Sequence, residues 1–206
     1  MRHKPLIGVL SLQGCVEPHK PHIEAAGGAF LKIKKAEDFE RADAFILPGG
    51  ESTTMLKLIN AFSLEETMRD HFARKPVWGI CAGAILMAER VHISPLEEGG
   101  KNNRNQKSFA LLPMTVTRNA YGRQLDSIQE DIDGYTVSYI RAPVIEKAGK
   151  GVEILAKREG KPVWVRKGRY MASTFHAELT LDFPSPMHRA FFSLIENSES
   201  PLAIQA

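Results

Sequence analysis

The chain has 206 residues, enough for one domain with a substantial core, which we expect to span 1–206. Hydrophobic residues make up 43% and charged residues 25%, as in soluble globular proteins. The net charge of only +3, without long basic runs, argues against nucleic-acid binding. With only two cysteines and an N-terminal apolar run too short for a signal sequence or a membrane span, we expect a cytoplasmic protein with no membrane association.

The first half of the chain alternates buried strands with helices. The strands are short, nearly continuous apolar runs at Leu6–Leu10, 30–33, Ala44–Leu47 and Val77–Ile80. A helix is predicted over 18–26, a second begins after Ser52 as its N-cap, and Leu64, Met68 and Phe72 share one face of a third. This alternation predicts a doubly wound α/β fold whose mixed, mainly parallel sheet is flanked by helices.

The second half is rich in strands and poor in helices. We expect strands at 113–117, 136–141, 152–156, 163–165 and 170–174. They should extend the sheet with antiparallel strands. A last helix begins at 185–186, and residues 197–206 form a polar tail that we expect to fray from a core of about 6–195. The polar stretch 97–107 is predicted to be an exposed loop.

A Gly-x-Cys-x-Gly motif at 79–83 joins a predicted strand to a predicted helix. The two glycines permit a sharp turn that would project the Cys81 thiol at the carboxyl edge of the sheet, as in a nucleophile elbow. A helix N-terminus beneath the thiol favours the reactive thiolate. Considered alone, Cys81 could equally be a buried structural cysteine.

His176 and Glu178 lie two residues apart near the end of the last predicted strand. On an extended segment they face the same side, so Glu178 can orient the imidazole while its other nitrogen takes a proton from a thiol. A surface His and Glu would be the ordinary alternative. The glycines of Leu47-Pro-Gly-Gly-Glu-Ser52 follow another strand and could offer backbone N–H groups to an oxyanion, with Ala82 N–H as a second donor.

Together these motifs resemble the class I, triad-type glutamine amidotransferases, and most closely the glutaminase subunits of pyridoxal phosphate synthases. The matching strings begin at Ile7 (IGVLSLQG), Leu47 (LPGGESTTM), Gly79 (GICAG), Arg118 (RNAYGRQ), Tyr139 (YIRAP) and Phe175 (FHAEL). The resemblance extends over nearly the whole chain, from about residue 6 to 194.

The resemblance implies a glutaminase that hydrolyses L-glutamine to L-glutamate and ammonia. Its partner would be a synthase subunit, in a large hetero-oligomer, that uses the ammonia to make pyridoxal phosphate. The implied nucleophile is Cys81, with His176 as the acid–base and Glu178 as its orienter. The other implied site residues are Gly49, Gly50, Glu51, Arg118, Ile140 and Arg141 for glutamine, Gly50 and Ala82 for the oxyanion, and Gln13 at the face toward the synthase. No metal or cofactor is implied.

Two features depart from the family pattern. Ala177 stands where the family usually has proline, which could loosen His176 slightly without removing a functional group. The stretch between the elbow helix and Arg118 is longer than expected, mainly through 97–107, and we expect this loop to be inert.

The remaining histidines and cysteine are expected to have no catalytic role. His19 and His22 share a helix face, but no Cys or carboxylate pattern accompanies them, which disfavours a metal site. Cys15 is expected to be a small packed side chain. The other histidines are expected at the surface: His3, His71, His92 and His188.

Two other functions fit the same scaffold. One is a stand-alone hydrolase that acts on a peptide or a polyglutamate without a partner. The other is a non-catalytic, glutaminase-like module that regulates a synthase. Cys81, His176 and Glu178 are all present, which argues against a decayed site.

Overall fold

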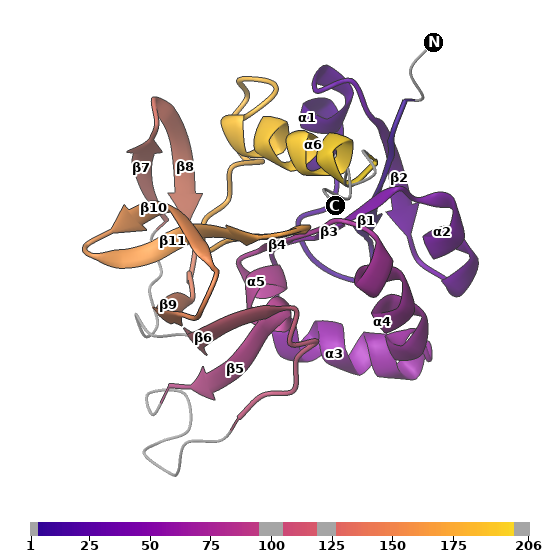
Figure 1. The fold of residues 1–206 in the computed structure, drawn as a ribbon, viewed down its shortest axis with the longest axis horizontal. Helices are drawn as coiled ribbons and strands as arrows, with labels where there is room; N and C mark the ends of the chain where they lie inside the picture. The colour runs from indigo at the N-terminus through magenta and orange to yellow at the C-terminus, as the bar shows by residue number, and fades with distance from the viewer. Residues whose placement is uncertain (1–3, 95–104, 119–126, 200–206) are drawn as a thin grey trace, which may run out of the picture.

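The computed structural model describes residues 4–94, 105–118 and 127–199. Its centre is a seven-stranded sheet in the order β10-β11-β12-β4-β3-β1-β2 (Figure 1). The strands of this sheet are β1 (Leu6–Leu10), β2 (Ala29–Ile33), β3 (Ala44–Leu47), β4 (Val77–Ile80), β10 (Glu153–Arg158), β11 (Lys161–Lys167) and β12 (Tyr170–Ser173). Strands β2, β1, β3, β4 and β12 are parallel, whereas β11 is antiparallel to both of its neighbours. The predicted mixed, mainly parallel α/β fold is therefore confirmed.

Helices cover both faces of this sheet, and all but the last are short. They are α1 (His19–Ala25), α2 (Ala36–Arg41), α3 (Ser52–Ala61), α4 (Glu65–Arg74), α5 (Ala82–Met87) and α6 (Pro186–Glu199). In Figure 1, α1 and α6 lie over one face, while α3, α4 and α5 lie over the other. The prediction of a frayed tail is wrong for residues 197–199, which belong to α6, and residues 200–206 lie outside the described residues.

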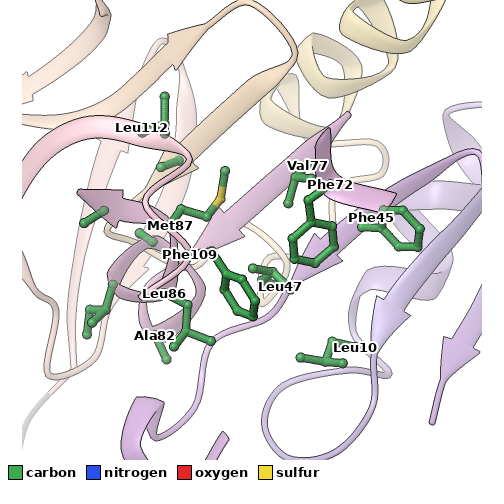
Figure 2. Packing of buried hydrophobic residues seen from close by; sticks show 14 of the residues in the cluster. Leu10, Phe45, Leu47, Phe72, Val77, Ala82, Leu86, Met87, Phe109 and Leu112 are labelled. Carbon is green, nitrogen blue, oxygen red and sulfur yellow. The ribbon is translucent and has the colours of Figure 1, made fainter. Parts of the chain in front are cut away.

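Apolar clusters on the two faces hold the helices to the sheet. Around α1 and α6, Ile23 and Phe191 pack with Trp78 of the sheet. On the other face, the rings of Phe45 and Phe72 lie 5.4 Å apart and Phe109 adds to them (Figure 2). Burial on both sides explains why β1, β3 and β4 are nearly continuous apolar runs. Strand β2 is at the sheet edge and only partly buried, so the prediction of a covered sheet is wrong there.

The second half extends the central sheet less than predicted. Strand β12 joins it parallel to β4, and the β10–β11 hairpin extends it through antiparallel pairing of β11 with β12. A three-stranded sheet and a separate hairpin take up the remainder: β5 (Ala88–Ile93), β6 (Leu112–Arg118) and β9 (Val144–Ala148) in the first, β7 (Ile128–Ile132) and β8 (Tyr135–Tyr139) in the second. Strand β8 ends at Tyr139, so Ile140 and Arg141 follow the strand rather than belong to it.

The N-cap of α3 is Glu51, not Ser52 as the sequence suggested. The Glu51 carboxylate accepts hydrogen bonds from the N–H groups of Thr53 (3.0 Å) and Thr54 (2.7 Å), and Ser52 is the first helical residue. Partial burial opposes ionisation of Glu51, but the hydrogen bonds from Thr54 and Thr53 outweigh it and lower its pKa to about 2.

We predict that Glu51→Ala lowers the free energy of unfolding near pH 7 by about 1 kcal/mol, the usual worth of an N-cap. A carboxylate with a lowered folded-state pKa stabilises the fold above its ordinary value of 4.5, and this contribution is lost as the pH falls toward about 2. The difference from wild type should therefore shrink at about pH 3. Urea unfolding of both proteins near pH 7 and at about pH 3 measures this difference in the free energy of unfolding.

Glu66→Ala is the matched control for this measurement. Glu66 is an exposed carboxylate in the first turn of α4, and no hydrogen bond to it is recorded among the described residues. Its loss should change stability by much less at either pH. An equal loss in both variants would contradict the assignment of Glu51 as the cap.

Candidate active site

The segment that carries Cys81 turns sharply between β4 and α5, and Cys81 adopts φ 49° and ψ −102°. A side chain with this backbone is strained, which is a cost that the surroundings must offset. Cys81 N–H donates to the carbonyl of Ser173 on β12 at 2.8 Å, which ties the turn to the sheet. The thiol is 5% exposed and lies 3.9 Å from the carbonyl oxygen of Ile140.

The two glycines of the motif are required by close backbone contacts. A Cβ on Gly83 would lie 2.0 Å from the carbonyl oxygen of Leu47, and a Cβ on Gly79 would lie 2.5 Å from that of Gly83. Real Cβ atoms do not approach so closely, so larger residues would push the elbow away from β3. The Gly-x-Cys-x-Gly pattern is therefore explained by packing of Gly83 against β3 and of Gly79 against the first turn of α5.

His176 and Glu178 follow β12 and lie beside the elbow. The backbone of His176 pairs with Ser138 of β8 through two hydrogen bonds of 2.8 and 3.1 Å. Its Nδ1 lies 2.6 Å from Oε1 of Glu178, and both side chains are at least 95% buried. The contact that the spacing of the two residues predicted is therefore present.

The charge state of this pair follows from its contacts. Burial lowers the pKa of His176, but hydrogen bonds with Cys81 and Glu178 outweigh this and raise it well above its usual value. Burial raises the pKa of Glu178, and the hydrogen bond from His176 outweighs this and lowers it. Both shifts favour a positive charge on the imidazole, which lies between Cys81 and the Glu178 carboxylate.

A cavity of about 370 Å³ opens beside Cys81 and His176. Nine of the predicted site residues line it: Gln13, Gly49, Gly50, Glu51, Cys81, Arg118, Ile140, Arg141 and His176. Glu178 is not in the lining and contacts His176, while Ala82 is buried at the first turn of α5. The segments that the sequence placed at strand ends therefore meet at one pocket, as expected for open α/β sheets.

The floor of the cavity is built by two neighbouring loops. Gly49 accepts a hydrogen bond from Cys15 N–H at 2.9 Å, and Gln13 Oε1 accepts one from Glu51 N–H at 2.9 Å. Gly49 packs against the imidazole so closely that a Cβ there would lie 2.1 Å from Cε1 of His176. These contacts leave room for glycine only.

Arg118 enters the cavity from β6 and is 8% exposed. Its guanidinium lies 3.2 Å from Oε1 of Glu51 and also donates to Thr53 and Gln106. Gln106 Oε1 in addition accepts from Ser52 Oγ at 3.1 Å. Residues 119–124 of the Arg118 motif lie outside the described residues.

Three expectations about the surroundings of the site are wrong. Gln106 belongs to the stretch predicted to be an inert exposed loop, yet it contacts Arg118; residues 97–104 of that stretch lie outside the described residues. Cys15, expected to be a small packed side chain, is only half-buried and lines the cavity. His71 and His188 are 1% and 0% exposed, so they are not surface residues.

No helix in the described part of the chain is long and apolar enough to cross a membrane. Within residues 4–94, 105–118 and 127–199, no group of three or more His, Cys, Asp or Glu side chains is arranged to hold a metal ion.

Comparison with known proteins gives consistent matches. The model of the SNO glutamine amidotransferase family matches residues 9–196. A pyridoxal 5'-phosphate synthase subunit PdxT of Koribacter versatilis is 40% identical, over 94% of this chain and 97% of that protein. The PdxT subunit of Thermotoga neapolitana is 39% identical, over 92% of this chain and 99% of that protein.

Solved structures agree with these matches. A crystal structure described as a glutamine amidotransferase superposes with a TM-score of 0.78 at 38% identity, covering 92% of this chain and 98% of that one. A PurLQS structure from Thermotoga maritima, 17% identical with a TM-score of 0.54 over 95% and 99% of the two chains, shares the fold.

We predict that Gly49→Ala displaces the imidazole of His176. The added methyl group would overlap Cε1, so the ring must leave Glu178 and the thiol. The pKa of His176, which these partners raise, should then fall toward its ordinary value of 6.5. An NMR titration of the imidazole Cε1–H measures this change.

Gly160→Ala serves as the control, because a Cβ there meets nothing within 4 Å. That variant should lose a little stability through its positive φ and leave the titration of His176 unchanged. A wild-type titration curve for His176 in Gly49→Ala would show that the loop yields and the ring does not.

Proposed function

Because this chain belongs to the SNO glutamine amidotransferase family, we propose that it is the glutaminase subunit of a pyridoxal phosphate synthase. In this role it hydrolyses L-glutamine to L-glutamate and ammonia, and the ammonia passes to a synthase subunit. The relatives from Koribacter and Thermotoga are named pyridoxal 5'-phosphate synthase subunit PdxT, which supports the assignment to that synthase.

The observation that carries the proposal is the arrangement around Cys81. The strained elbow presents a thiol at the cavity, and the 2.6 Å contact between His176 and Glu178 lies directly behind it. A thiol, a proton carrier and an orienting carboxylate are the parts that acyl transfer to cysteine needs. In this proposal Cys81 and His176 are catalytic residues and Glu178 is the orienter.

The proposed reaction has two steps. The Cys81 thiolate attacks the side-chain amide carbon of glutamine, and His176 gives its proton to the nitrogen as ammonia leaves, which yields a glutamyl thioester. Water, deprotonated by His176, then attacks the thioester carbonyl, and glutamate leaves as the thiol re-forms. Backbone N–H groups of Gly50 and Ala82 are proposed to stabilise the oxyanion in both steps.

The other cavity residues are proposed to hold the substrate. Arg118 would pair with the α-carboxylate of glutamine, since a guanidinium offers two parallel N–H donors. Glu51 already contacts Arg118. Its carboxylate would also attract the α-ammonium group of glutamine. Gly49, Ile140 and Arg141 complete the proposed pocket.

The proposed partner docks over the mouth of this cavity. Ile140 and Leu179 line it and are 39% and 36% exposed, which is a high exposure for large apolar side chains at a polar site. Gln13 lines the same cavity. We propose a large hetero-oligomer with the synthase subunit in the cytoplasm, where the two free thiols, Cys15 and Cys81, would stay reduced. The glutaminase itself would use no metal or cofactor.

Replacement of the two cysteines separates their roles. Cys81→Ala should abolish glutamine hydrolysis with the fold intact, because no other group on the elbow can form the thioester. Cys15→Ala should be nearly silent, although Cys15 also lines the cavity. Ammonia release in the presence of the synthase subunit, with circular dichroism as a check of folding, measures both. Near wild-type release by folded Cys81→Ala protein would refute the assignment.

Activity should depend on the partner. We expect weak hydrolysis by the isolated chain and clear hydrolysis once the synthase subunit binds. A peptide unit in the 48–50 loop can rotate at low cost because of its glycines, and the absence of one oxyanion donor costs about 100- to 1000-fold in turnover. Ammonia release at fixed glutamine, titrated with the synthase subunit, tests this dependence. Full activity that does not change across the titration would favour a stand-alone hydrolase.

A further inference from the structure

Three fully buried histidines have no part in the proposed reaction. His19 and His22 come from α1 and His188 from α6, the two helices that lie together over one face of the sheet (Figure 1). Each is 0% exposed. Burying three imidazoles costs free energy unless their nitrogens are paired, so their hydrogen bonds are informative.

The three rings form one connected group with Ser185. His19 Nδ1 lies 3.0 Å from His188 Nε2, and His188 Nδ1 lies 2.7 Å from Ser185 Oγ. Ser185 N–H donates to His22 Nδ1 at 3.0 Å, and the ring of His22 stacks on that of His188 at 4.4 Å. The chain of contacts thus runs from Ser185 through His188 to His19.

All three histidines are neutral at physiological pH. Burial lowers the pKa of His19 to about 4, and it lowers those of His22 and His188 as well. A neutral imidazole has one N–H and one bare nitrogen. The His19–His188 contact therefore has two possible directions, which differ in whether Nε2 of His19 carries a proton.

Glu178 decides between these two directions. Its Oε2 atom is buried and has no hydrogen-bond partner among the described residues, and the same is true of His19 Nε2. The two side chains interact through the interior, because the charge of Glu178 raises the pKa of His19 and His19 lowers that of Glu178. A nitrogen lone pair that faces a buried carboxylate oxygen is repelled by it, whereas an N–H group in the same place is attracted to that oxygen.

We infer that His19 is a positioning residue whose Nε2–H holds the second oxygen of Glu178, and that His188 and Ser185 fix the tautomer of His19 that makes this possible. Ser185 O–H then donates to His188 Nδ1, His188 Nε2–H donates to His19 Nδ1, and His19 Nε2–H points to Glu178. A small rotation of the ring, or one bridging water, completes the last contact.

This arrangement deepens the proposed function and rests on it. Glu178 would be held from both sides, by His176 at Oε1 and by His19 at Oε2. The titratable groups that act on His19 are Glu178, His22 and His176, and of these only Glu178 carries a negative charge. A carboxylate fixed at both oxygens keeps the imidazole of His176 in one orientation while its proton moves.

Tautomers of the wild-type chain provide the first test. The full-length protein is labelled with ¹⁵N-histidine, and long-range ¹H–¹⁵N correlations show which nitrogen of each neutral ring carries the proton. We expect the Nε2–H tautomer for both His19 and His188. An Nδ1–H tautomer for His19 would overturn the inference, because no donor would then face Glu178.

Two substitutions of His19 provide the kinetic test. The amide of Gln reaches the position of Nε2, so His19→Gln keeps a donor toward Glu178, whereas the shorter His19→Asn keeps only the side that faces His188. With the synthase subunit present, His19→Asn should lower kcat about 10-fold, the lower end of the usual range for a residue that orients a functional group, at nearly unchanged KM. His19→Gln should retain most of the activity.

His71→Gln is the matched control, since His71 is equally buried on the opposite face of the sheet and contacts Glu40 there. It should lose stability and keep wild-type kcat. Wild-type kcat in folded His19→Asn, or an equal loss in His19→Gln, would overturn the inference. The tautomer measurement needs no activity, so it still tests His19 if the chain proves not to be a glutaminase.

Discussion

The backbone contact between the elbow and strand β3 is the constraint on which the rest of the site depends. Gly83 lies so close to the carbonyl of Leu47 that no side chain fits between them. This contact sets the depth at which α5 begins, and hence the height of the Cys81 thiol above the sheet. The loop after β3 starts at the same carbonyl, so the thiol and the predicted oxyanion loop share one reference point.

The strained backbone of Cys81 is tolerated because hydrogen bonds and packing hold the segments on both sides of it in place. Its N–H is bonded to β12, and the residues of α5 pack against β5 and β6 in the same apolar cluster as Phe45 and Phe72. The two apolar clusters meet the site from opposite faces of the sheet. Free energy gained by burying these side chains offsets a local backbone cost of about 1–3 kcal/mol at the elbow.

The sequence was sufficient to predict the features that depend on neighbours in the chain. The strands β1, β3 and β4, the elbow, and the pairing of His176 with Glu178 all follow from local patterns. It could not show contacts made by distant segments. Gln106 lies in a polar stretch of the sequence. Its contact with Arg118 is visible only in the folded chain, where Gln106 lies beside the start of α3. His188 is one polar residue in an apolar helix face, and its burial depends on α1. Glu51 and Ser52 both suit an N-cap, and the position of the first helical turn selects Glu51.

The pairing of Ser138 with His176 uses only main-chain atoms. Any small residue other than proline that keeps an extended backbone at position 138 can make the same two bonds, so the Ser138 side chain is not what holds the segment that carries His176. Ile140 follows that hairpin, is 39% exposed and takes no part in the pairing. A change of its side chain therefore leaves intact the main-chain frame on which His176 is held.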